Sequence, residues 1–73
     1  MEGVIVYSLD VDRWAFLGDN EVHFYLKCGQ CLEIKMFGRY RSCRLEYNEN
    51  WYVVFEGISF ILLHPFIYQV RCD

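Results

Sequence analysis

The sequence predicts an all-β domain, built as a small barrel or sandwich of short strands. Apolar and polar residues alternate with a period of two over several short runs, as half-buried strands require. Turn-forming residues separate these runs at intervals of about 8–12 residues, which is typical of small barrels and sandwiches. No run of useful length shows the periodicity of an amphipathic helix.

The N-terminal third is expected to form three strands. β-Branched and aromatic residues predict the first at 4–7, and apolar residues that share one face predict the next two at 13–17 and 21–26. Turn residues at 10–12 and 18–20 separate them.

The middle of the chain has the clearest alternation. Residues 31–36 place three apolar side chains on one side and Glu33 and Lys35 on the other. Residues 40–47 predict the hairpin partner of this run, and the apolar run 51–55 predicts a strand that is covered on both sides.

The C-terminal part is ambiguous at one place. Residues 58–63 fit either a short strand or one short helical turn, and His64 ends the segment because the residue before Pro65 avoids helix. Residues 66–72 predict a closing strand.

The composition points to a self-sufficient core. The 73 residues are 55% hydrophobic and 19% aromatic, so the chain can bury a dense core and still leave apolar surface for an interface. No apolar run approaches the ~20 residues of a membrane span, and no signal peptide is visible. We therefore expect a cytoplasmic protein with no membrane partner.

The four cysteines are expected to be reduced and structural, as is usual in the cytoplasm. The Cys28–Cys31 pair leads into a strand and so lacks the helix that a redox site needs. A zinc site with Cys43, Cys72 or His64 would need a second close ligand pair. We expect neither a metal nor another cofactor. A buried thiol on each side of the Gly29 turn is the preferred interpretation.

Catalytic motifs are missing. Neither His23 nor His64 lies in a nucleophilic motif, and the chain has no nucleophile elbow or glycine-rich phosphate loop. The expectation is that the protein is not an enzyme.

A basic run is the strongest functional feature of the sequence. Residues 27–44 hold five of the seven Lys and Arg residues, between two acidic ends. Arginines and aromatics on one face can grip phosphates and stack bases, and they are also enriched in protein interfaces. A solvated face with local pairs to Glu33 and Glu46 is the alternative. The expected binding surface comprises Lys35, Arg39, Tyr40, Arg41, Arg44 and Trp51.

Aromatic residues near this run suggest a second possibility, a cage for a cation. Its members would be Tyr40, Tyr47, Trp51 and Tyr52. Packing in a hairpin or in the core is the alternative for Trp51.

Three segments carry a resemblance to known proteins: "LKCGQCLEI", "GRYRSCRLE" and "NWYVVFEGI". Their layout resembles small SH3-like barrels of the Tudor type. It is also similar to a short family of unknown function, found in Gram-positive bacteria and their mobile elements. The resemblance covers about residues 24–70. It implies an SH3-like barrel and says nothing about catalysis. Together with the chain length, which allows one domain at most, this leads us to expect a single barrel of five to six strands over residues 1–73.

Three functions remain open. The first is a non-enzymatic module of a mobile element or phage that binds a protein partner. The second is an inhibitor of a host defence nuclease, of the anti-CRISPR type, because acidic patches can imitate nucleic acid. The third is a nucleic-acid-binding barrel that uses the basic run. Self-association into a homodimer is also expected, because the segment Ile58–Val70 is strongly apolar.

Overall fold

A computed structural model describes residues 1–72 and confirms the all-β class. These residues contain no helix, and so none that could cross a membrane. They form eight strands: β1 (Glu2–Ser8), β2 (Arg13–Gly18), β3 (Glu21–Tyr25), β4 (Cys31–Met36), β5 (Arg39–Asn48), β6 (Asn50–Phe55), β7 (Ile58–Ile61) and β8 (Tyr68–Arg71).

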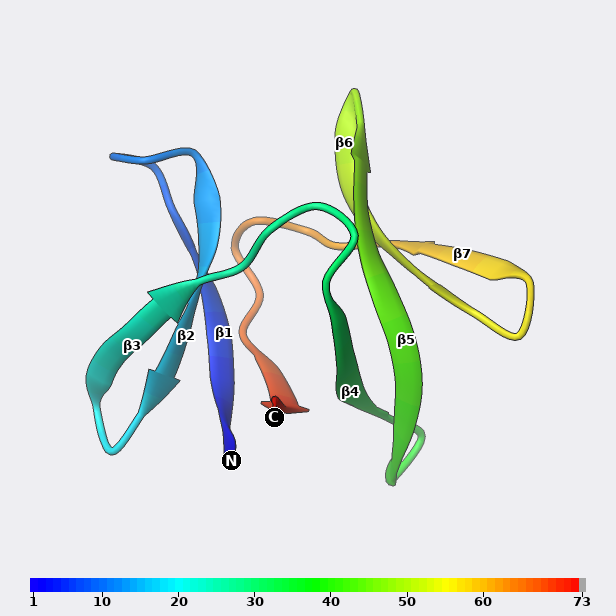
Figure 1. The fold of residues 1–73 in the computed structure, drawn as a ribbon, viewed down its shortest axis with the longest axis horizontal. Helices are drawn as coiled ribbons and strands as arrows, with labels where there is room; N and C mark the ends of the chain where they lie inside the picture. The colour runs from blue at the N-terminus through cyan, green and yellow to red at the C-terminus, as the bar shows by residue number, and fades with distance from the viewer. Residues whose placement is uncertain (73) are drawn as a thin grey trace.

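All eight strands belong to one antiparallel sheet, in the order β3-β2-β1-β8-β4-β5-β6-β7. The C-terminal strand β8 lies between β1 and β4 and joins the group β1–β3 to the group β4–β7 (Figure 1). Within the described chain, β3 and β7 are therefore the two edges of the sheet. The all-β class is confirmed, while the SH3-like barrel stays a prediction.

The expected number of five to six strands is wrong, because each short apolar run forms a strand of its own. The segment at 58–63 is the clearest case. Residues 56 and 57 both have positive φ, 51° and 76°, and so make the two-residue turn that matches the twist of a hairpin. After this turn the chain runs antiparallel to β6 and pairs with it as β7. Of the two alternatives for 58–63, the short strand is therefore correct and the helical turn is wrong.

The core lies between the two groups of strands. Ile5, Trp14 and Phe16 from the first group and Ile34 and Leu45 from the second are fully buried in one cluster. The alternation predicted at 31–36 is confirmed, since the three apolar side chains of β4 point into this core. The two groups of strands belong to one sheet and bury their apolar side chains against each other, so no second sheet is needed to cover the core.

The segment at 26–30 crosses from one group to the other and is hydrogen-bonded to both. The Leu26 amide donates to the Trp14 carbonyl (2.8 Å), and the Gly29 amide donates to the Leu45 carbonyl (2.6 Å). The Leu45 amide in turn donates to the Gln30 carbonyl (2.8 Å). We call residues 26–30 the crossover.

Candidate binding surfaces

The predicted basic surface is divided between the two faces of the sheet. Residues Lys35 and Tyr40 are cross-strand partners on the outer face, whereas Arg41 lies opposite the buried Ile34 and Arg39 opposite Met36 on the core side. The cause is the period of two, because neighbouring residues of a strand point to opposite faces. The basic run is therefore continuous in sequence but not on the surface.

On the outer face, Tyr40 is held by its neighbours. The Arg71 guanidinium carbon lies 3.9 Å from the centre of the Tyr40 ring, and the Lys35 ammonium lies 5.8 Å from it. The Tyr40 hydroxyl donates to Glu2 (3.4 Å), which also pairs with Arg71 (3.8 Å). Each cation here already has a partner within the domain.

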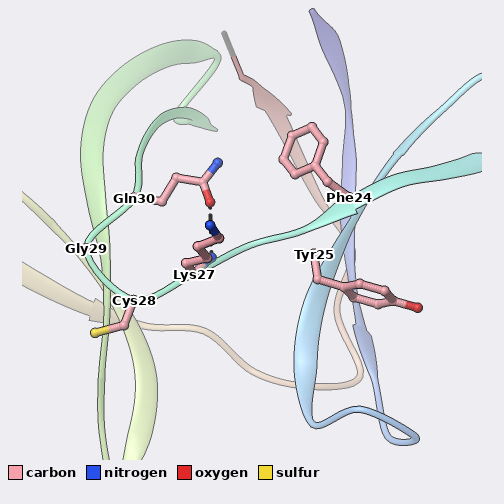
Figure 2. A pocket seen from close by; sticks show the side chains of 6 residues that line it. All are labelled: Phe24, Tyr25, Lys27, Cys28, Gly29 and Gln30. Carbon is pink, nitrogen blue, oxygen red and sulfur yellow. Dashed lines mark hydrogen bonds between the residues drawn. The ribbon is translucent and has the colours of Figure 1, made fainter.

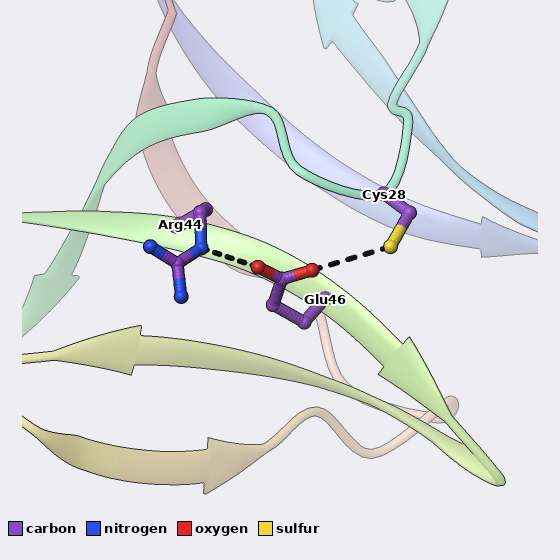
Figure 3. Close-up of polar contacts among 3 residues, drawn as sticks. All are labelled: Cys28, Arg44 and Glu46. Atoms are coloured by element: carbon purple, nitrogen blue, oxygen red, sulfur yellow. Dashed lines mark hydrogen bonds and ion pairs between the residues drawn. The ribbon is translucent and has the colours of Figure 1, made fainter.

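Arg44 is also engaged locally. Its side chain pairs with Glu46, which accepts a second hydrogen bond from the Cys28 thiol at 3.3 Å (Figure 3). The hydrogen bond from Cys28, followed by that from Arg44, lowers the pKa of Glu46 below its usual value. The expected local pair to Glu46 is thus present, while Glu33 makes no ion pair with any residue in 1–72.

The aromatic cage does not assemble. Trp51 is only 8% exposed and belongs to the core, where its ring lies 4.9 Å from that of Tyr47. Tyr52 is the next residue along β6 and points to the other face. Tyr40 is occupied by the cations described above, so the four rings do not face one another.

The four thiols fall into two classes. Cys43 and Cys72 are buried, but Cys28 and Cys31 are exposed, because they flank a turn of the crossover rather than facing the core. The expectation that thiols on both sides of Gly29 are buried is therefore wrong. Burial, and then the neighbouring Cys31 thiol, raises the pKa of Cys43 to about 11.

Potential metal ligands do not cluster within residues 1–72. No group of three or more His, Cys, Asp or Glu side chains in this range is placed to share a metal ion. His23 Nε2 lies 2.9 Å from the Gly18 carbonyl oxygen, and the His64 ring stacks on Tyr7 at 3.7 Å. Both histidines thus contact the fold rather than a cysteine nucleophile.

A surface hollow of about 590 Å³ lies beside the crossover, lined by Phe24, Tyr25 and residues 27–30. Figure 2 shows the rings of Phe24 and Tyr25 pointing away from the Cys28 thiol. The Gln30 side chain is used to accept a hydrogen bond from the Lys27 amide (3.0 Å). The groups that line this hollow do not converge on a common point, as a reactive centre requires.

The edge strand β7 is the most unusual surface. All four of its residues are exposed, and Ile58, Phe60 and Ile61 keep 57%, 40% and 53% of their surface accessible. The strand has no charged residue, no proline and no irregularity in its register with β6. Natural edge strands usually carry at least one such feature, because an open edge is a template for another strand.

The hydrogen-bond pattern shows which backbone groups of β7 are available. The Leu62 amide donates to the Trp51 carbonyl (2.9 Å), so residues 58, 60 and 62 face β6. The backbone groups of Ser59 and Ile61 must then point away from the sheet. The Leu63 amide follows the same rule, since it donates outward to the Tyr68 hydroxyl (3.0 Å).

Comparison with known proteins adds the family to this picture. Residues 3–72 match the family described as a domain of unknown function, DUF5348. The chain belongs to the DUF5348 family. No curated protein matches this DUF5348 chain.

One solved structure resembles this DUF5348 domain over nearly its whole length. It is a crystal structure of a protein from Ruminococcus gnavus, determined by the Northeast Structural Genomics Consortium. The two are 25% identical with a TM-score of 0.76, and the match covers 97% of this chain and 99% of that one. The expected membership of a family of unknown function is confirmed.

Sequence reasoning did not single out the exposed edge residues Ser59, Phe60 and Ile61 of this DUF5348 domain. The apolar segment Ile58–Val70 was the available signal, and it led to the expectation of self-association. The sequence of β7 does not show that this strand lies at the edge of the sheet, because that position depends on how the other strands are arranged.

Proposed function

We propose that this DUF5348 domain is a non-enzymatic protein-binding module that receives a β-strand of another chain on the edge of β7. The outward-facing backbone groups of Ser59 and Ile61 on an uncharged, regular edge carry this proposal. In such strand addition, main-chain hydrogen bonds supply affinity and the alternating side chains supply specificity.

The side chains of β7 support an apolar partner strand. Phe60 lies beside the buried Val53 on the core side, and Ile61 lies beside Tyr52 on the outer face. A strand added to this edge would cover apolar groups on both of its faces. Burial of such surface contributes about 25 cal/mol per Å², which adds to the backbone hydrogen bonds.

The nucleic-acid alternative has less support from the geometry. Its cations lie on two faces, and those on the outer face contact Tyr40 or an acidic neighbour. A gel-shift assay at low salt addresses it directly, because phosphate contacts weaken steeply as salt rises. A salt-sensitive shift that is lost on substituting Arg39, Arg41 and Arg44 together would favour this alternative over strand addition.

The biological setting is part of the proposal. Cytoplasmic location is part of the proposal, because exposed cysteines such as Cys28 and Cys31 are usual in a compartment that keeps thiols reduced. A mobile element or phage as the source is supported by the sequence resemblance, and the genes that flank the coding sequence would test it.

A pair of matched lysine variants tests the proposed function. Ile61 on β7 and Val22 on β3 are almost equally exposed, at 53% and 52%. A charge on an edge strand blocks pairing, so Ile61→Lys should abolish binding of a partner chain and Val22→Lys should not.

Amide hydrogen exchange of the wild-type domain provides the second readout. Partner binding should slow exchange at Ser59 and Ile61, whose amides point outward, and change little at Phe60, which already faces β6. Binding that survives Ile61→Lys, or that leaves both outward amides unprotected, would contradict the proposal.

A further inference from the structure

We infer that the strand received by β7 is β7 of a second copy of this chain, paired antiparallel with Phe60 on the two-fold axis. This inference rests on the proposed function and names the partner of the same edge. It concerns Ile58–Ile61, the four residues of β7.

The hydrogen-bond pattern fixes the register of such a pair. Only the outward-facing residues, Ser59 and Ile61, can exchange hydrogen bonds across the new junction. Opposing Ser59 of each copy to Ile61 of the other uses both residues in both copies. Phe60 then faces itself across the axis as a non-hydrogen-bonded pair, the type in which side chains approach most closely.

The two edges of the sheet explain why a second copy fits and why assembly would stop at two. Pairing β7 with β3 of the next molecule would be head-to-tail and would continue into a filament. The β3 edge opposes this, because His23 forms a bulge in it and Glu21 places a charge on it. Pairing β7 with β7 is symmetric. The free edges of such a dimer would both be β3 strands, whose bulge and charge oppose further pairing.

The absence of charge on β7 removes an obstacle to self-pairing. The chain carries a net charge of −3, so two copies repel each other overall. None of that charge lies on the paired strand, and the nearest charged residue along the chain is Glu56 in the turn before it. A partner strand would therefore meet only apolar groups and the Ser59 hydroxyl.

The size of the domain also favours a second copy. The core of a domain of this length supplies only a small margin of stability, which oligomerisation can supplement. A four-residue strand offers less surface than the ~800 Å² per partner that a standard interface buries. We therefore expect a weak dimer that dissociates on dilution.

Cysteine cross-linking tests the register. In a background with Cys28→Ser and Cys31→Ser, Phe60→Cys places two thiols face to face, about 4.5 Å apart at Cα, within disulfide range. Mild oxidation should link nearly all of this variant as dimers. Ser59→Cys and Ile61→Cys should each fail to form a disulfide between copies when oxidised alone, because like positions are offset diagonally. A mixture of the two variants should cross-link, because the two positions oppose each other in this register.

Sedimentation of the wild-type chain completes the test. The apparent mass should rise with concentration from 8.8 kDa toward twice that value, and Ile61→Lys should hold it at 8.8 kDa while Val22→Lys does not. If the wild type stays monomeric at its solubility limit and Phe60→Cys fails to cross-link, the second copy is ruled out. Protection of the outward amides by another protein would then still support the proposed function, and its absence would remove both.

Discussion

The two edge strands of this sheet, β3 and β7, both present unpaired backbone groups to other chains, but they differ in the features that hinder such pairing. On β3, His23 is an extra residue between the pairs Val22–Leu17 and Phe24–Phe16, and its ring is tied back to the Gly18 carbonyl. On β7, Ile58 to Ile61 pair with β6 without interruption. One edge is bent and partly charged, and the other is regular and apolar.

This difference teaches that exposure alone does not mark a binding surface. Val22 on β3 is as exposed as Ile61 on β7, yet only Ile61 lies on an edge whose outward backbone groups run in a regular row. Strand addition needs both the apolar side chains and that row. The two edges should therefore differ in binding while they contribute equally little to stability.

The largest expected effect is at the centre of the sheet. Leu45 is fully buried between the two groups of strands, so Leu45→Ala should lower the free energy of unfolding by about 2–5 kcal/mol. Denaturant titration would measure this, with the exposed Tyr47→Ala on the same strand as the control. An equal loss in both variants would show that stability does not come from the core described above.

Removing the Glu21 charge and the His23 side chain from β3 should produce the next largest change, an increase in the size of the assemblies. Glu21→Thr combined with His23→Thr deletes the charge and the side-chain contact to Gly18. We expect β3 then to accept β7 of another molecule, giving assemblies larger than dimers, which light scattering would detect. A double variant with the same mass distribution as the wild type would show that the bulge alone protects β3.

Thiol chemistry gives a smaller effect and checks that the centre of the sheet stays closed. Cys28 and Cys31 should react quickly with an alkylating reagent near neutral pH, and Cys43 slowly, because burial keeps it protonated. Mass spectrometry over time would distinguish them. Equal rates at all three would mean that the core opens as readily as the crossover.

The same thiol predicts a pH dependence. The pKa of Cys43 is about 11 in the folded chain against 9.0 for an unperturbed thiol. The unfolded state therefore releases the proton first, and the free energy of unfolding should fall between pH 9 and pH 11. Cys43→Ala should flatten this part of the curve, as measured by denaturant titration across that range.

The smallest expected effect is the change in the free energy of unfolding on substituting a residue of β7. Ile61→Lys should alter the free energy of unfolding by only about 0.5 kcal/mol or less, measured at a concentration where the chain is monomeric. Val22→Lys should behave in the same way. A large loss in Ile61→Lys would mean that β7 serves folding rather than binding, which would remove the contrast between the edges.

Much of the local structure could be predicted from the residues. The alternation at 31–36 indicated β4 and its buried face, and the turns at 10–12 and 18–20 separated the neighbouring strands. The number of strands was underestimated at five to six, because each short apolar run forms a strand of its own. The predicted basic surface remained close in sequence but was divided in space by the pleat.

What the sequence determined by itself is local: periodicity, turns and burial propensity depend on residues a few positions apart. What only the tertiary structure decided is adjacency. The backbone of Cys72 accepts a hydrogen bond from the Met1 amino group (2.9 Å) because β8 inserts between β1 and β4. That insertion joins the two groups of strands and leaves β3 and β7 outermost. A strand becomes an edge through its neighbours, and no pattern within Ile58–Ile61 could record which neighbours it would have.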